Sequence, residues 1–218
     1  MPKKMTDLAV GGQAVIEGVM MRNASKTATA VRLPSGDIDV ETRTVSSIRE
    51  RYPILNLPLV RGSVIMVESL IIGMRALSFS AQAAGEENEQ MTKKEIAMTI
   101  LFALVLASIL FIVIPTGAAH LAAAYTDDPI VFNLIEGGIR LLVFLLYIWG
   151  ISFMGGIRRV FQYHGAEHKT IHCYEAGEAL TVENVQKFPR LHPRCGTNFL
   201  LIVMVVAIVF HVFFGWPD

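Results

Sequence analysis

The stretch IAMTILFALVLASILFIVI at residues 96–114 contains no charged side chain over 19 residues. A helix needs roughly 20 mostly apolar residues to cross the hydrocarbon core of a bilayer. A second stretch, FLLIVMVVAIVFHVFFGW at residues 199–216, carries His211 as its one titratable side chain. Both stretches predict membrane-spanning helices, so we expect an integral membrane α-helical protein.

A third stretch, IRLLVFLLYIWGISFMGGI at residues 139–157, is apolar after Arg140. Its Tyr147 and Trp149 suit helix packing or the membrane interface. The composition agrees with a membrane protein, because 53% of the residues are hydrophobic and 17% are charged, and the mean hydropathy is +0.49. The sequence therefore predicts about three transmembrane helices.

The apolar segment LVRGSVIMVESLIIGMRALSF at residues 59–79 is interrupted by charges at seven-residue spacing, which are Arg61, Glu68 and Arg75. Seven residues are close to two helical turns, so the three charges share one face and the opposite face is apolar. This pattern is typical of an amphipathic helix that lies on the bilayer or against protein. We expect an amphipathic or re-entrant helix at 59–83.

The basic residues predict the orientation. Twelve of the nineteen Lys and Arg residues precede residue 96, none lies at 115–139, and six lie at 158–194. Since loops rich in Lys and Arg stay in the cytosol, the N-terminus and the 158–195 loop are expected there, with the C-terminus outside. The first ten residues, MPKKMTDLAV, lack the apolar core of a signal peptide. A net charge of zero gives no argument for a nucleic-acid partner.

The N-terminal residues 1–58 are expected to form a small cytosolic module that contains β-structure. Alternating segments at about 28–33 and 37–44 flank the turn sequence PSGD, which predicts a β-hairpin. The glycine-rich stretch GGQAVIEGVMMRN at 11–23 completes no phosphate-loop pattern and is interpreted as a packed strand. A polar connector at 84–95 would then lead into a membrane domain at 96–218.

The stretch YHGAEHKTIHCYE at residues 163–175 is rich in groups that bind metals. In one continuous helix, its three histidines and two glutamates point into one sector of roughly 140°; these residues are His164, Glu167, His168, His172 and Glu175. The first and last histidine lie roughly 12 Å apart along such a helix, so one cation can bind either histidine pair but not all three. The segment HGAEH matches the H-x-x-E-H pattern, in which two histidines bind zinc and the glutamate is the general base.

A catalytic zinc usually has three protein ligands and one open position. The segment LHPRCGTN at 191–198 offers His192 or Cys195 as the third, while His172 and Glu17 are further candidates. Both cysteines fall in the predicted cytosolic loop, where thiols stay reduced. The sequence therefore predicts Glu167 as the catalytic residue and zinc or another divalent metal as the cofactor, with a set of candidate ligands: His164, His168, His172, His192 and Cys195.

Structural interpretations compete with the functional ones. A lone histidine is more often hydrogen-bonded or solvated, as expected for His120 and His211, and Glu175 can pair with Lys169 on an exposed face. Glu136 would mark the outer interface of the membrane. A carboxylate among apolar residues needs a basic partner, and the candidate partners of Glu68 are Arg61, Arg75 and Arg140.

Three blocks together, GGQAVIEGVMMR, YHGAEHKTIHCYE and HPRCGTNFL, resemble the YqhQ-like family of bacterial inner-membrane proteins. The resemblance covers nearly the whole chain, with the blocks in the same order. It implies a multi-pass protein of the bacterial cytoplasmic (inner) membrane. Members of this family are described as a domain of unknown function and as predicted metal-dependent enzymes. The metal expectation rests on the same histidines, so the resemblance adds no independent support for it.

Three functions fit these observations. The first is a membrane-embedded zinc-dependent hydrolase, such as a peptidase, with its site at the cytosolic membrane face. The second is a non-catalytic scaffold or accessory factor of membrane-protein biogenesis, in which the His/Cys cluster holds a structural metal. The third is a transporter, which would need a homo-oligomer because three spans are too few for most solute pathways. Expected partners are the lipid bilayer, other membrane proteins or further copies of the chain.

Overall fold

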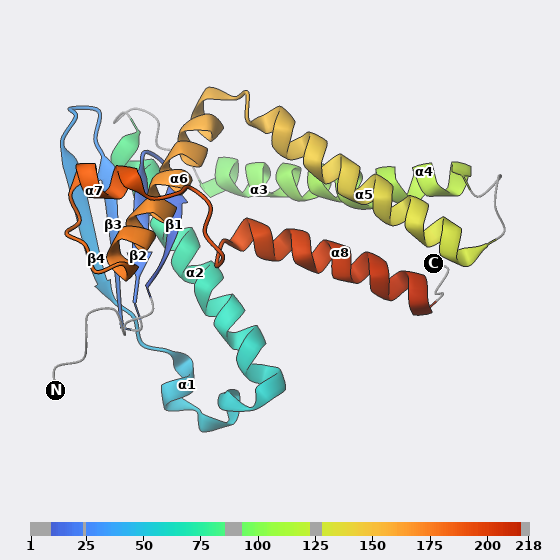
Figure 1. Cartoon of the computed structure of the whole chain (residues 1–218), viewed down its shortest axis with the longest axis horizontal. Coiled ribbons are helices and arrows are strands. Elements are labelled where there is room, and N and C mark those ends of the chain that lie inside the picture. Colours follow the sequence, from blue (N-terminus) through green and yellow to red (C-terminus); the bar gives the residue numbers. More distant parts are fainter. Residues whose placement is uncertain (1–9, 24, 86–92, 123–127, 215–218) are drawn as a thin grey trace. The chain divides into compact units, whose positions relative to one another are not determined.

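The structure is a computed structural model that describes residues 10–23, 25–85, 93–122 and 128–214. The chain is mostly helical, with one N-terminal antiparallel sheet, and it divides into two compact units (Figure 1). The first unit combines the chain up to Gln90 with Gly155–His192, and the second combines Met91–Met154 with the chain from Pro193 onward. The histidine-rich segment thus belongs with the sheet, whereas the sequence-based division grouped it with the membrane helices. Most of the predicted connector at 84–95 lies outside the described residues.

The sheet has four strands in sequential order, β1 (Gly11–Val15), β2 (Gly18–Arg22), β3 (Lys26–Arg32) and β4 (Ile38–Thr44). The predicted hairpin is confirmed as β3 and β4, and Gly36 has the positive φ of 92° that its turn requires. The glycine-rich stretch was expected to be one strand, but it forms the hairpin of β1 and β2. Glu17 makes this turn with a φ of 50°, which is uncommon for a residue with a Cβ.

In the part of the first unit that the structure describes, five helices accompany the sheet: α1 (Ile48–Arg51), the 3₁₀ helix η2 (Pro53–Asn56), α2 (Pro58–Ala84), α6 (Gly155–Glu175) and α7 (Val182–Lys187). Alternate residues of a strand point to opposite faces of the sheet. In β1, Gln13 meets α2 at Gly73, whereas the adjacent Gly12 meets α6 at Glu167. Helices α2 and α6 therefore cover opposite faces, and the sheet lies between them.

One face of α2 packs against the sheet, where Ala76 joins Val15, Met20 and Val31 in the apolar core. Among the described residues, Glu68 of this helix forms no ion pair with a basic side chain of the kind predicted from the sequence. Its carboxylate accepts hydrogen bonds from the Ser47 hydroxyl at 2.9 Å and from the Ile48 N–H at 2.8 Å. The prediction failed because the start of α1 supplies donors that no helical spacing could indicate.

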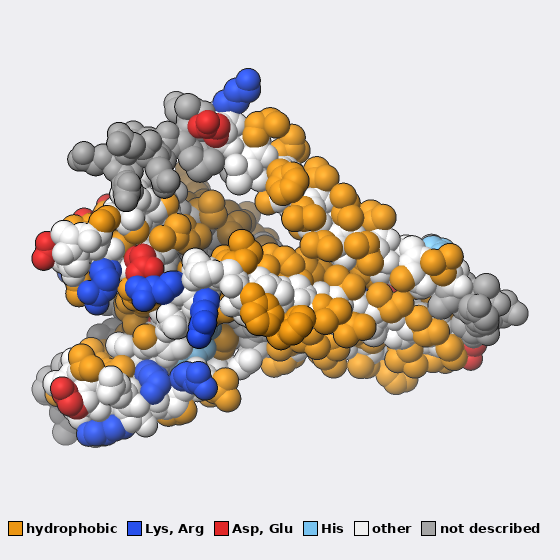
Figure 2. Space-filling view, turned by 90° about the horizontal axis from the view of Figure 1, so that it is seen from above, with side chains coloured by type: hydrophobic (Ala, Val, Ile, Leu, Met, Phe, Trp, Pro, Cys, Tyr) orange, Lys and Arg blue, Asp and Glu red, His pale blue; other side chains and the backbone are white. Residues whose placement is uncertain are grey.

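The second unit consists of α3 (Lys93–Ser108), the π-helix η3 (Ile109–Val113), α4 (Ile114–Ala122), α5 (Pro129–Ile151) and α8 (Gly196–Phe214). The π-helical turn ends two residues before Pro115, which lacks the N–H that a regular helix would use. Within the described residues, four helical stretches are long and apolar enough to cross a membrane: Val60–Ala84, Ala97–Leu121, Pro129–Ile151 and Gly196–Phe213. Hydrophobic side chains cover long areas of such helices (Figure 2). The sequence predicted about three spans, and α2 is the additional candidate.

The span predicted at 139–157 is wrong in its boundaries. Helix α5 begins ten residues earlier at Pro129, where the Asp128 carboxylate accepts a hydrogen bond from the Ile130 N–H at 2.9 Å. It ends at Ile151, and α6 starts anew at Gly155, so the two are not one continuous helix as the histidine argument assumed. Much of the segment 115–139, which the orientation argument treated as a loop between two spans, is consequently helical.

Polar side chains connect the helices inside the second unit. The Arg140 guanidinium donates to the Glu136 carboxylate at 2.6 Å, and the Thr116 hydroxyl donates to the same oxygen at 3.1 Å. The Asn133 amide donates to the backbone carbonyl of His211 at 3.1 Å. These bonds link α4, α5 and α8. They also correct one expectation, because Arg140 pairs with the buried Glu136 rather than with Glu68.

Replacing Gly18 by alanine tests the close approach of β2 and β3. The added Cβ would lie 3.0 Å from the Cα of Val31 and closer still to the Ala30 carbonyl, and backbone atoms cannot swing away. We expect the Gly18→Ala variant to unfold at lower temperature, with a cost of about 1–3 kcal/mol for overpacking. Gly11→Ala is the matched control, since nothing lies within 4 Å of its added Cβ. Equal melting temperatures for both variants in detergent would contradict the described strand packing.

Replacing one partner of the Glu136–Arg140 ion pair, whose carboxylate is buried, should cost more than replacing both. Arg140→Met leaves the Glu136 carboxylate buried with Thr116 alone, an unsatisfied charge that costs about 1–3 kcal/mol or more. Glu136→Gln with Arg140→Met removes both charges, and we expect it to recover part of that loss. Thermal unfolding of the three proteins in detergent gives the comparison. If the double variant is the least stable and the losses add, the two side chains do not interact as described.

Candidate functional site

Helix α6 positions the residues of the H-x-x-E-H segment. His164 and His168 lie one turn apart with ring centroids separated by 4.3 Å, and Glu167 and His168 are buried with 4% and 6% exposure. Gly165, which lies between the two histidines, does not break the helix, because α6 is continuous from Gly155 to Glu175. The predicted pairing of the two imidazoles is therefore present, on the helix face that packs against the sheet.

The protonated nitrogen of His168 is fixed by the backbone. Its Nδ1 lies 2.6 Å from the carbonyl oxygen of Arg190, and a carbonyl can only accept a hydrogen bond. Nδ1 must therefore carry the proton, so a neutral His168 ring presents an unprotonated Nε2. That Nε2 lies 3.5 Å from the Oε2 atom of Glu167. Two acceptors that face each other require a proton or a cation between them.

The carboxylate of Glu167 lies against the glycine-rich strand. A Cβ added at Gly12 would come within 2.6 Å of its Cγ, so only glycine leaves room for the side chain here. Burial raises the pKa of Glu167, and the nearby His168 partly offsets this effect. Burial also lowers the pKa of His164, with a further contribution from His168, which favours the neutral form that binds metals.

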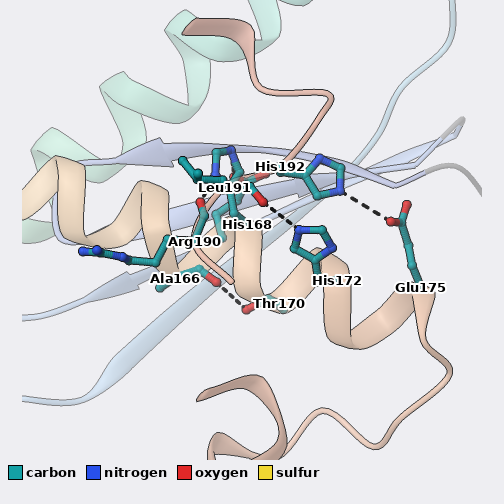
Figure 3. A network of polar contacts seen from close by, with 9 residues as sticks. Ala166, His168, Thr170, His172, Glu175, Arg190, Leu191 and His192 are labelled. Atoms are coloured by element: carbon teal, nitrogen blue, oxygen red, sulfur yellow. Dashed lines mark hydrogen bonds and ion pairs between the residues drawn. The ribbon is translucent and has the colours of Figure 1, made fainter. Parts of the chain in front are cut away.

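A second group of candidate residues lies at the end of α6 (Figure 3). His172, Glu175 and His192 offer ligand atoms that all lie within 4.8 Å of one another. The His172 and His192 rings have centroids 4.5 Å apart, and His192 Nε2 is 3.4 Å from the Glu175 carboxylate. Glu175 was expected to pair with Lys169, but the Lys169 ammonium donates instead to the Gln186 carbonyl at 2.8 Å.

The two cysteines differ in their place in the fold. Cys173 is buried on α6, and its thiol donates to the Ala179 carbonyl at 3.6 Å. Cys195 is buried in the second unit, just before α8. Its role as a third ligand for His164 and His168 remains a prediction.

Glu17 is held by partners that the sequence did not indicate. Arg159 of α6 donates two hydrogen bonds to its carboxylate, and the Tyr163 hydroxyl adds a third at 3.3 Å. These bonds fasten the strained β1–β2 turn to the start of α6. The Arg159 hydrogen bonds lower the pKa of Glu17. A carboxylate occupied in this way is a poor candidate for completing a metal site.

Three further features were missed because they involve the backbone. The carbonyls of Arg190 and Leu191 orient His168 and His172, and no side-chain pattern reports which carbonyl will be within reach. A single sequence likewise does not indicate that Gly12 lies close to Glu167. Glu175 had a usable signal, because it falls on the same helical sector as the histidines.

Comparison with known proteins places the chain in a family without assigning it an activity. A family model described as "Protein of unknown function (DUF1385)" matches residues 57–218. The chain belongs to this family. It is also 36% identical over 225 residues to "Uncharacterized protein YqhQ" of Bacillus subtilis (strain 168), an alignment that covers 95% of this chain and 70% of that protein. No solved structure matches the chain. The resemblance inferred from the three sequence blocks is thereby confirmed.

The Glu17–Arg159 pair predicts how stability depends on pH. Because the folded-state pKa of Glu17 lies below its ordinary value of 4.5, the pair stabilises the fold at any pH above that value. The stabilisation is lost as the pH falls through the lower, folded-state pKa. We expect the melting temperature of the wild type to exceed that of Glu17→Gln at pH of about 6 and the difference to shrink below about pH 4. A difference that does not change with pH would contradict this origin, and Glu178→Gln serves as the control.

Proposed function

We propose that the protein is a divalent-cation-dependent hydrolase of the bacterial cytoplasmic membrane, with its reacting groups on α6 at the cytosolic face. The observation that carries the proposal is the unprotonated Nε2 of His168 opposite the Glu167 carboxylate at 3.5 Å. A lone pair that faces a carboxylate requires a proton or a cation between or beside the two atoms. A cation bound at Nε2 would supply this positive charge beside the carboxylate, and the imidazole donors present fit zinc or a similar metal.

The chain itself supplies the remaining features of such a site. His164 and His168 would hold the cation, and the Arg190 carbonyl keeps the His168 ring oriented, as partners of metal-binding histidines commonly do. When bound, a divalent cation would polarise a substrate oxygen and neutralise developing negative charge. Glu167 would take a proton from the attacking water at Oε2 and return it to the leaving group. Water oxygen thus joins the acyl carbon as the bond to the leaving group breaks.

The second candidate function is a scaffold with a structural metal, and burial favours it. Structural zinc sites are closed, whereas catalytic sites keep a position open to substrate. Both Glu167 and His168 are more than nine-tenths buried beneath β1. In this alternative the cation would fasten α6 to the sheet, and other membrane proteins or further copies of the chain would be the partners.

Metal analysis combined with Glu167→Gln distinguishes these functions. We expect the purified full-length protein to lose one cation equivalent, measured by elemental analysis, when His164 and His168 are both replaced by alanine. The control His120→Ala should lose none, because His120 is an exposed residue of α4. Glu167→Gln should retain the cation and abolish hydrolysis of a panel of peptide, ester and lipid substrates, a loss of at least about 100-fold.

Three results would overturn the hydrolase. If Glu167→Gln loses the cation, the carboxylate is a ligand and the scaffold is favoured. If the wild type carries the cation and hydrolyses nothing in the panel, the catalytic role fails. An unchanged cation content after loss of both histidines would remove the metal from this pair altogether.

A further inference from the structure

The end of α6 carries a second set of metal-type donors that the proposed hydrolase does not use. His172 and Glu175 project from the last turn of the helix, and His192 approaches them from the irregular segment that follows α7 (Figure 3). The three donor atoms lie within 4.8 Å of one another, although their positions in the chain are up to 20 residues apart. Helical spacing alone does not explain why His192 lies close to the two residues of α6.

The orientation of His172 leaves one nitrogen available to a ligand. Its Nε2 lies 2.9 Å from the Leu191 carbonyl, which can only accept, so Nε2 carries the proton and Nδ1 retains its lone pair. A metal-binding histidine almost always donates its other N–H to a carbonyl or carboxylate in this manner. The Leu191 carbonyl thus does for His172 what the Arg190 carbonyl does for His168.

The separation of the donors fits a single ion. Zinc binds histidine nitrogen and carboxylate oxygen at roughly 2.0–2.2 Å, so two ligands at a tetrahedral angle lie about 3.4 Å apart. His192 Nε2 and Glu175 Oε2 are separated by 3.4 Å. His192 is 4% exposed, whereas the Glu175 side chain is 41% exposed, so the group is anchored on one side and reachable from solvent on the other.

We propose that His172, Glu175 and His192 bind a second divalent cation, of the zinc class, independently of the His164 and His168 pair. His164 and His172 lie roughly 12 Å apart along the helix, which is too far for both to bind the same ion. Each proposed cation is therefore bound by a different pair of histidines. Two imidazoles and one carboxylate leave a fourth position to water or another ligand. The bound cation clamps the segment around Leu191 to α6, just ahead of the sequence that enters α8.

Cobalt titration of the metal-free, full-length protein in detergent tests this site. Glu175→Gln keeps the size of the side chain and removes its charge, and we expect it to weaken binding of one Co²⁺ equivalent at least about tenfold. Glu178→Gln is the matched control, because Glu178 is an exposed carboxylate three residues further on. The protein lacking both His164 and His168 should still bind this equivalent, which separates the outcome from that of the proposed hydrolase.

Trypsin cleavage after Arg190 gives a second measurement. Zinc should slow this cleavage in the wild type and in Glu178→Gln, but not in Glu175→Gln or His172→Ala, because only an intact site clamps the segment. If Glu175→Gln binds cobalt as tightly as the wild type, or if Glu178→Gln weakens binding equally, the proposal is wrong. Protection by zinc that persists without His172 and Glu175 would contradict it as well.

Discussion

Two backbone carbonyls determine what the histidines of α6 can do. The Arg190 carbonyl accepts from His168 Nδ1 and the Leu191 carbonyl accepts from His172 Nε2, so each ring has one nitrogen committed to the backbone and one left over. His168 uses Nδ1 for its bond and His172 uses Nε2. The remaining nitrogens of the two rings therefore differ, so two histidines one turn apart can face different neighbours. Without these bonds the rings would rotate freely and change tautomer, and neither would present a fixed lone pair. The irregular segment after α7 is therefore as important to the site as the helix that carries the side chains.

The sheet supplies the other half of the arrangement. Alternation along β1 turns Gln13 toward α2 and Gly12 toward α6, and the missing side chain of Gly12 is what gives the Glu167 carboxylate its place. Burying that group costs free energy unless it meets a positive charge or takes up a proton. The Glu17–Arg159 bonds hold the same hairpin against the start of the helix. The small sheet thus contacts the candidate site residues of α6 with one face, while α2 covers its opposite face.

The predictable and unpredictable parts of this protein differ in their physical origin. Long apolar runs and the PSGD turn are local signals, so α8, the α3–α4 run and the β3–β4 hairpin could be expected from sequence. The limits of α5 could not, because Glu136 and Arg140 neutralise each other inside the unit and only look like the edge of a span when read separately. Helical spacing placed the histidines and Glu175 on one face of α6. It could not show that Glu68 would be satisfied by Ser47 and a backbone N–H, or which carbonyls would meet the imidazoles, since those contacts depend on how distant segments pack.

The two candidate groups on α6 differ in exposure to solvent, which is the property that would separate a structural from a catalytic metal site. Glu167 and His168 are enclosed, whereas the side chain of Glu175 is 41% exposed. An enclosed carboxylate near neutral pH is a strong base only if something keeps it ionised, and a cation on His168 would do so without opening the site to water. A substrate would then have to enter past His164, the partly exposed member of the pair. Access at His164 therefore bears most directly on the choice between enzyme and scaffold: a hydrolase needs that side open, and a closed metal site gains stability when it is covered.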